Sequence, residues 1–114
     1  MVSRIRRKII YKIIRELVAQ KISIPISEIS MWTNLKADLE IDSLEQFELA
    51  HLAMNEFKLT FFEVEIFVRL KTVKDIVYYI DQISPKNVME LLFVLFDVIF
   101  QKNTNKNQHE EFIY

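Results

Sequence analysis

The sequence has no glycine, no cysteine and only two prolines, Pro25 and Pro85, among its 114 residues. The lack of cysteine excludes disulfide bonds, thiolate metal sites and a cysteine nucleophile. The lack of glycine excludes a glycine-rich phosphate-binding loop, and the scarcity of both turn-forming residues argues against a β protein with many tight turns. Hydrophobic residues make up 51% of the chain and charged residues 27%, as in a globular protein. We therefore expect a helical globular domain.

Apolar segments of membrane-spanning length are also lacking. The apolar residues near the N-terminus are interrupted by Lys12 and Arg15, which argues against a secretory signal. The longest apolar stretch, Val88 to Phe100, contains Glu90 and Asp97 and is shorter than a membrane span. We therefore expect a cytoplasmic protein.

The net charge is only −1, but it is unevenly distributed. Seven basic residues and one acid lie between Met1 and Lys21, a net charge of +6, whereas Ile22 to Ser84 carries −6. A domain without an overall positive charge is not expected to bind nucleic acid. We interpret the basic segment as a solvated helix face, with an anionic membrane or an acidic neighbouring segment as the alternative.

The first part of the chain predicts one long helix followed by a long loop. Apolar residues recur at helical spacing from Val2 through Ile5 to Val18, with charged residues between them. The segment from Lys21 to Ile41 is a loop, in which Trp32 and Leu35 are expected to hold the chain to the core.

Three further helices are predicted up to about Ile83. One begins after Asp42, and a short, mostly apolar helix is expected within Phe61 to Leu70. Thr72 and Asp75 form a capping pattern that opens the last of the three.

Beyond residue 84 the character of the sequence changes. Val88 to Phe100 predicts an additional helix that is apolar nearly all round, so it would pack within the molecule or contact a dimer partner, another protein or a membrane surface. Residues 101–114 are polar and are expected to form a flexible tail. The predicted organisation is a domain of residues 1–84, an extra helix within 85–100, and the tail.

The junction between the long loop and the second helix carries the clearest chemical pattern. Asp42 is a favoured N-cap residue, and Glu45 three positions later completes a capping-box pattern. Ser43 is thereby placed in the first turn, where backbone N–H groups lack partners and the helix dipole favours an anion such as a phosphate. Alone, an Asp-Ser pair is an ordinary helix start.

In its wider context, this pattern resembles the acyl carrier protein family over roughly residues 2–83. The resemblance implies an all-α, four-helix bundle with three longer helices and one short, to which the C-terminal apolar helix is an addition. The matching residues are Asp38-Leu39, Asp42-Ser43-Leu44, Glu48-Leu49, Glu56-Phe57 and the run from Lys71 to Ile80, which begins Lys71-Thr72-Val73.

The resemblance implies a carrier that has no catalytic activity. Ser43, between Asp42 and Leu44, would bear a covalent 4′-phosphopantetheine arm, added by a phosphopantetheinyl transferase. The arm would hold fatty acyl, aminoacyl or polyketide cargo as a thioester, in fatty-acid, lipid or secondary-metabolite biosynthesis. The resemblance also implies docking to acyl-transferring or acyl-modifying enzymes that present basic patches, through Leu44, Glu45, Glu48, His51 and Glu56.

The sequence departs from the family at several positions. Glu40 stands where a glycine usually precedes the aspartate, and His51, Met54 and Asn55 make the second helix less acidic than usual. Ser43 and His51 are the only candidate nucleophile and base, but eight residues of helix separate them by about 12 Å, so catalysis is not expected. No metal-ligand pattern is present. The remaining alternative is a non-covalent adaptor of carrier-like fold, which the Val88–Phe100 segment favours.

Overall fold

The computed structural model describes residues 2–59 and 62–84, and this part of the chain is helical. Its only β feature is an isolated bridge between Asn34 and Thr72. Three longer helices and one short helix confirm the predicted all-α class and element order. The predicted helix at Val88–Phe100 and the tail of residues 101–114 lie outside the described residues, so the division of the chain at residue 84 stays a prediction. In chain order the elements are α1 (Val2–Ile22), the 3-10 turn η1 (Ile26–Glu28), α2 (Ser43–Glu56), α3 (Val64–Phe67) and α4 (Val73–Ile83).

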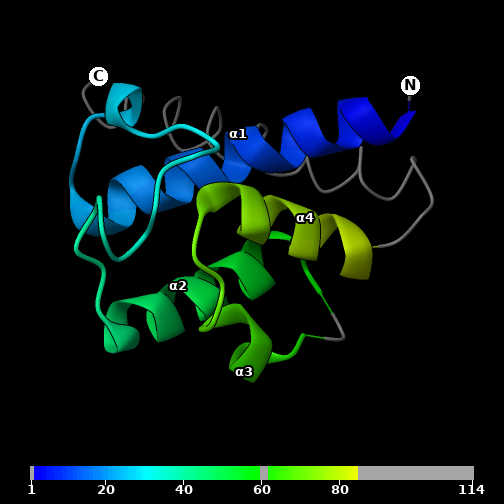
Figure 1. The fold of residues 1–114 in the computed structure, drawn as a ribbon. Coiled ribbons are helices and arrows are strands. Elements are labelled where there is room, and N and C mark those ends of the chain that lie inside the picture. The colour runs from blue at the N-terminus through cyan, green and yellow to red at the C-terminus, as the bar shows by residue number, and fades with distance from the viewer. Residues whose placement is uncertain (1, 60–61, 85–114) are drawn as a thin grey trace, which may run out of the picture. The chain divides into compact units, whose positions relative to one another are not determined.

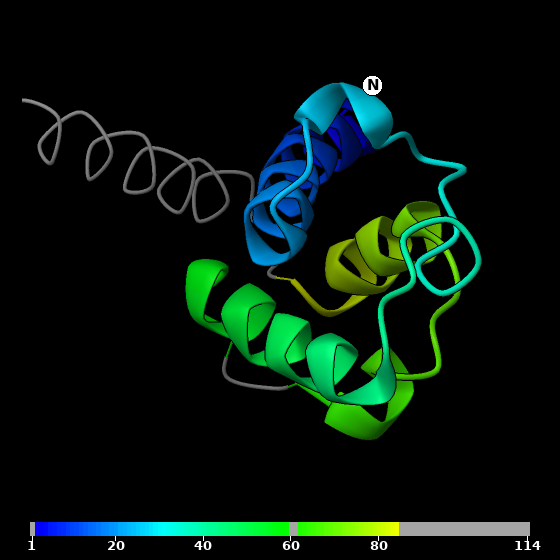
Figure 2. The ribbon, with the colours of Figure 1, turned by 90° about the vertical axis from the view of Figure 1, so that its left-hand side faces the viewer.

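Helix α1 packs against both α4 and α2, and α3 packs against α2 (Figures 1 and 2). The core lies where these helices meet, and each contributes apolar side chains that are fully buried, which is the main stabilising contribution in such a bundle. The largest of them include Ile10, Ile14 and Val18 of α1, Leu49 of α2, Phe67 of α3, and Ile76, Val77 and Ile80 of α4.

An ion pair contributes to the contact between α1 and α4. It involves Arg6, whereas the apolar pattern of α1 placed its neighbour Ile5 on the buried face. The Ile5 side chain is 54% exposed, whereas Arg6 is only 4% exposed. Arg6 Nε donates to Asp81 Oδ1 over 2.9 Å, and Arg7 Nε to the second carboxylate oxygen over 3.3 Å. The apolar pattern was therefore wrong about the burial of Ile5. Arg6 can be buried in its place because Asp81 of α4 gives it a charged partner, which apolar spacing within one helix does not reveal.

The long loop is held to the start of α4 by backbone hydrogen bonds. Leu35, which is fully buried, donates its N–H to the Lys71 carbonyl over 2.8 Å, and Lys74 N–H donates to the Met31 carbonyl over 2.9 Å. Leu35 thus anchors the loop as predicted. Trp32 does not, since its side chain is 73% exposed. The backbone bonds on this stretch turn the indole ring outward.

Among the residues that the structure describes, three take the left-handed conformation that glycine usually supplies. Ser23 and Lys58, with φ of 57° and 51°, follow the ends of α1 and α2. Each is followed by a residue whose N–H bonds back five positions, from Ile24 to Ala19 and from Leu59 to Met54, both over 3.1 Å. This is the Schellman arrangement, here built without glycine. The third residue is Glu40, with φ of 55°.

None of the helices within the described ranges is both long enough and apolar enough to cross a membrane.

Candidate functional site

Ser43 is the first residue of α2, and its side chain is exposed. Its hydroxyl forms no hydrogen bond with any residue that the structure describes. The group is therefore open to a reagent and is not engaged in holding the fold together. Access of this kind is the first requirement for a serine that is to be modified by another protein.

The conformation at Ser43 is fixed by a complete capping box. Asp42, at φ −85° and ψ 177°, accepts the Glu45 N–H on Oδ1 over 2.7 Å. Glu45 Oε1 in turn accepts the Asp42 N–H over 3.1 Å. The capping pattern predicted from the sequence is thus confirmed, and it determines that α2 begins at Ser43.

The start of α2 suits a phosphate group. The two caps satisfy the N–H groups of Asp42 and Glu45, while those of Ser43 and Leu44 have no acceptor among the described residues. Both N–H groups lie at the positive end of a helix of 14 residues. A phosphodiester on the Ser43 oxygen would be held beside two free donors and a favourable dipole, so the residues present fit 4′-phosphopantetheine.

The buried side chain of Gln46, one turn after Ser43, anchors the start of α2 to the following elements. Its Nε2 donates to the carbonyls of Phe67 over 3.0 Å and Leu70 over 2.8 Å. The first carbonyl ends α3 and the second lies in the connection to α4, so one amide joins α2 to both α3 and that connection. Sequence reasoning missed Gln46, because a single glutamine in an amphipathic helix is usually a solvent-facing residue; its only signal was its place among apolar neighbours.

The proposed docking residues are spread along α2 but differ in availability. Leu44 is 66% exposed and His51 is also exposed. Glu48 is engaged in an ion pair, since Lys21 Nζ of α1 lies 2.9 Å from its Oε2. Glu45 is half-buried and takes part in the cap, and Glu56, also half-buried, ends the helix. The carboxylates of α2 are therefore partly committed within the molecule.

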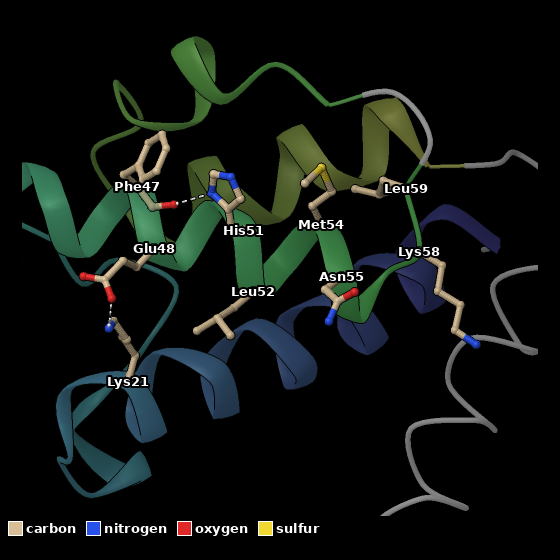
Figure 3. A pocket seen from close by; sticks show the side chains of 9 residues that line it. All are labelled: Lys21, Phe47, Glu48, His51, Leu52, Met54, Asn55, Lys58 and Leu59. Carbon is tan, nitrogen blue, oxygen red and sulfur yellow. Dashed lines mark hydrogen bonds and ion pairs between the residues drawn. The ribbon is translucent and has the colours of Figure 1, made fainter.

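An open groove of about 840 Å³ follows the exposed side of α2 (Figure 3). Polar and apolar side chains line it together, and two of the apolar ones, Phe47 at 46% and Leu52 at 40% exposure, were not predicted as surface contacts. The His51 and Phe47 rings lie with centroids 4.5 Å apart, and His51 Nδ1 is 3.0 Å from the Phe47 carbonyl oxygen. The sequence could have predicted this ring contact from the spacing of four residues, since such positions share a helix face.

The structure offers no catalytic arrangement at this site. Ser43 and His51 both belong to α2, eight residues and about 12 Å apart along its axis, and the ring nitrogen nearest the backbone is engaged with Phe47. Among residues 2–59 and 62–84, no group of three or more potential metal ligands is found.

Comparisons with known proteins agree with this geometry. A family model described as a phosphopantetheine attachment site matches residues 12–80. A protein of the Aster yellows witches'-broom phytoplasma, strain AYWB, named acyl carrier protein, is 37% identical over 71 residues, which cover 62% of this chain and 92% of the relative. An acyl carrier protein of the Onion yellows phytoplasma, strain OY-M, is 33% identical over 76 residues, which cover 67% of this chain and 99% of the relative.

Proposed function

Because this chain belongs to the acyl carrier protein family, a group of phosphopantetheine-binding proteins, we propose that Ser43 is the residue to which its arm is attached. The protein is a carrier and not an enzyme, and its 4′-phosphopantetheine is bound covalently. The observation that supports Ser43 is its position: an exposed hydroxyl at the first residue of α2, beside two backbone N–H groups that have no acceptor among the described residues.

Each neighbour of Ser43 has a separate task in this proposal. Asp42 fixes the helix start through its side chain, and Leu44 presents a largely exposed apolar surface that a phosphopantetheinyl transferase can contact. The Ser43 hydroxyl supplies the oxygen of the phosphodiester bond. When bound, the arm supplies a thiol that holds cargo as a thioester. The chain itself contributes the attachment point and the surface that partners recognise.

Docking of acyl-transferring and acyl-modifying enzymes is proposed to use the exposed side of α2. Leu44 provides an apolar contact and His51 an exposed ring, and Glu45, Glu48 and Glu56 provide negative charge for basic patches. Because Lys21 already pairs with Glu48, the charge available to partners is smaller than the number of acids suggests. We expect fast, weak association with only moderate salt dependence. The cargo is proposed to be acyl, aminoacyl or polyketide, in fatty-acid, lipid or secondary-metabolite biosynthesis.

The attachment site is tested by incubating the full chain with a promiscuous phosphopantetheinyl transferase and coenzyme A and measuring the intact mass. We expect one phosphopantetheine adduct on the wild type and none on Ser43→Ala. Ser27→Ala is the matched control, since Ser27 is also exposed but lies in η1. It should be modified as fully as the wild type.

Two results would decide against Ser43. An adduct that persists in Ser43→Ala would place the arm elsewhere. No adduct on the wild type would favour the alternative, a non-covalent adaptor with a carrier-like fold.

A further inference from the structure

A cluster of alternating aromatic and cationic side chains joins the long loop, α4 and α1, and the carrier function does not use it. Lys74 Nζ lies 4.6 Å from the centroid of the Trp32 ring and 5.5 Å from that of the Tyr78 ring. The Tyr78 ring also has Arg7 Cζ 4.7 Å from its centroid, and Arg7 Nη1 donates to Tyr78 Oη over 3.3 Å. We call Trp32, Lys74, Tyr78 and Arg7 the aromatic–cation cluster.

The rings of this cluster face solvent from a well-anchored backbone. Trp32 is 73% exposed and Tyr78 is 44% exposed. The loop on both sides of Trp32 is held to the start of α4, because Met31 accepts the Lys74 N–H over 2.9 Å and Thr33 accepts the Val73 N–H over 3.1 Å. The indole can therefore enter an apolar layer without any change of the fold.

Positive charge continues from the cluster along the exposed side of α1. Arg4 and Lys8, which are close to Arg7 in α1, are both exposed. Neither forms an ion pair with a described residue. Asp81 is the acid that contacts the cluster, but its carboxylate is only 16% exposed and is shared by Arg6 and Arg7. This surface is therefore cationic although the chain as a whole carries a charge of −1.

We propose that this surface binds anionic phospholipid membranes, with Trp32 in the interfacial layer and Arg4, Arg7, Lys8 and Lys74 at the lipid phosphates. Tryptophan and tyrosine rings favour the boundary between headgroups and acyl chains, and each cation near an anionic leaflet adds to the affinity. A purely polar acidic polypeptide would match the cations but would give the exposed indole no apolar surroundings. Since each contact is modest, the binding is reversible and weakened by salt.

Membrane binding through this surface uses no residue of the attachment helix α2. Helix α2 contacts α1 through Lys21 and Glu48, near the end of α1 that is far in sequence from Arg4 and Lys8. The proposal does not depend on Ser43 and can be tested on the unmodified chain.

Trp32 is the single tryptophan of the chain, so its fluorescence reports on this surface alone. The full-length protein is titrated with phosphatidylcholine vesicles that contain phosphatidylglycerol and, separately, with vesicles of pure phosphatidylcholine. We expect the emission maximum to move to shorter wavelength with the anionic vesicles only, and to return at high salt. Trp32 emission is measured instead of cosedimentation with vesicles, because binding through the apolar stretch Val88–Phe100 alone would also make the protein sediment.

The paired variants test whether the position of the charge matters. Arg4→Gln with Lys8→Gln should lower the apparent partition coefficient roughly tenfold or more, since two cations are lost. Lys36→Gln with Arg69→Gln removes the same charge from a groove that also contains Gln46 and Val68, and should leave the titration unchanged. Circular dichroism verifies that all variants keep their helical signal.

Three outcomes would overturn the proposal. The first is an emission maximum that anionic vesicles do not move, even if the protein sediments with them. The second is an equal loss of binding in both double variants. The third is an emission shift caused by polyglutamate but not by vesicles, which would indicate an acidic protein partner.

Discussion

At the scale of single residues, the Ser43 side chain is accessible because its neighbours form the hydrogen bonds that fix the start of α2. Asp42 and Glu45 satisfy each other's N–H groups, Gln46 anchors the first turn, and the Ser43 hydroxyl is left with no hydrogen bond to a described residue. The capping box was predictable from residue types three positions apart, and it was confirmed. The role of Gln46 was not, because its partners are carbonyl groups more than 20 residues away along the chain.

Glu40 gives a prediction at this scale. Its φ of 55° is a conformation in which a side chain is disfavoured, and it occupies the place where the family usually has glycine. We expect Glu40→Gly to raise the free energy of unfolding by about 1 kcal/mol. Glu40→Ala, which removes the carboxylate but keeps Cβ, should change it by much less. Urea denaturation of both variants measures the difference, and equal stability of the two would show that backbone strain is absent at this residue.

At the scale of elements, helix starts were easier to predict than helix lengths. Both capping boxes, at Asp42 and Thr72, were recognised from the sequence and are complete in the structure. A short helix was expected within Phe61 to Leu70, and α3 covers Val64–Phe67, four residues of that segment. After Phe67 the chain continues in tighter turns, in which the N–H groups of Arg69 and Leu70 donate to the carbonyls of Ile66 and Phe67, and Gln46 also donates to the Phe67 carbonyl.

The bonds made by Gln46 give a prediction for α3. Gln46→Leu leaves the carbonyls of Phe67 and Leu70 without their side-chain donor, so we expect a loss of about 1–3 kcal/mol in the free energy of unfolding. Amide hydrogen exchange should accelerate most in α3. Gln82→Leu is the control, since Gln82 is exposed on α4 and should be nearly neutral. If exchange rises evenly over the described helices, Gln46 does not hold α3 in particular.

At the scale of the whole molecule, the packing of helices against each other was only partly predictable. The apolar period identified most of the buried face of α1, but it could not reveal that Arg6 would be buried against Asp81, 75 residues away. The outward position of Trp32 was missed for a related reason, since it follows from backbone bonds between the loop and α4. The local periodicity of one segment does not indicate which distant segment packs against it.

The Arg6–Asp81 pair gives the prediction at this scale. Asp81→Ala would leave the Arg6 guanidinium buried without its carboxylate, and we expect the free energy of unfolding to fall by about 3 kcal/mol. The double variant Arg6→Leu, Asp81→Leu removes both charges and should recover much of that loss. Urea denaturation checks both values, and a double variant that is no more stable than Asp81→Ala would contradict this account of the α1–α4 contact.

The central claim is that the Ser43 hydroxyl, at the positive end of α2, carries the phosphopantetheine arm. Tandem mass spectrometry of peptides from the modified wild-type chain tests it most directly, because fragmentation assigns the added mass to one side chain. We predict that the mass lies on Ser43 and on no other serine. Its assignment to any other residue, or a chain that a competent transferase leaves unmodified, would contradict the account.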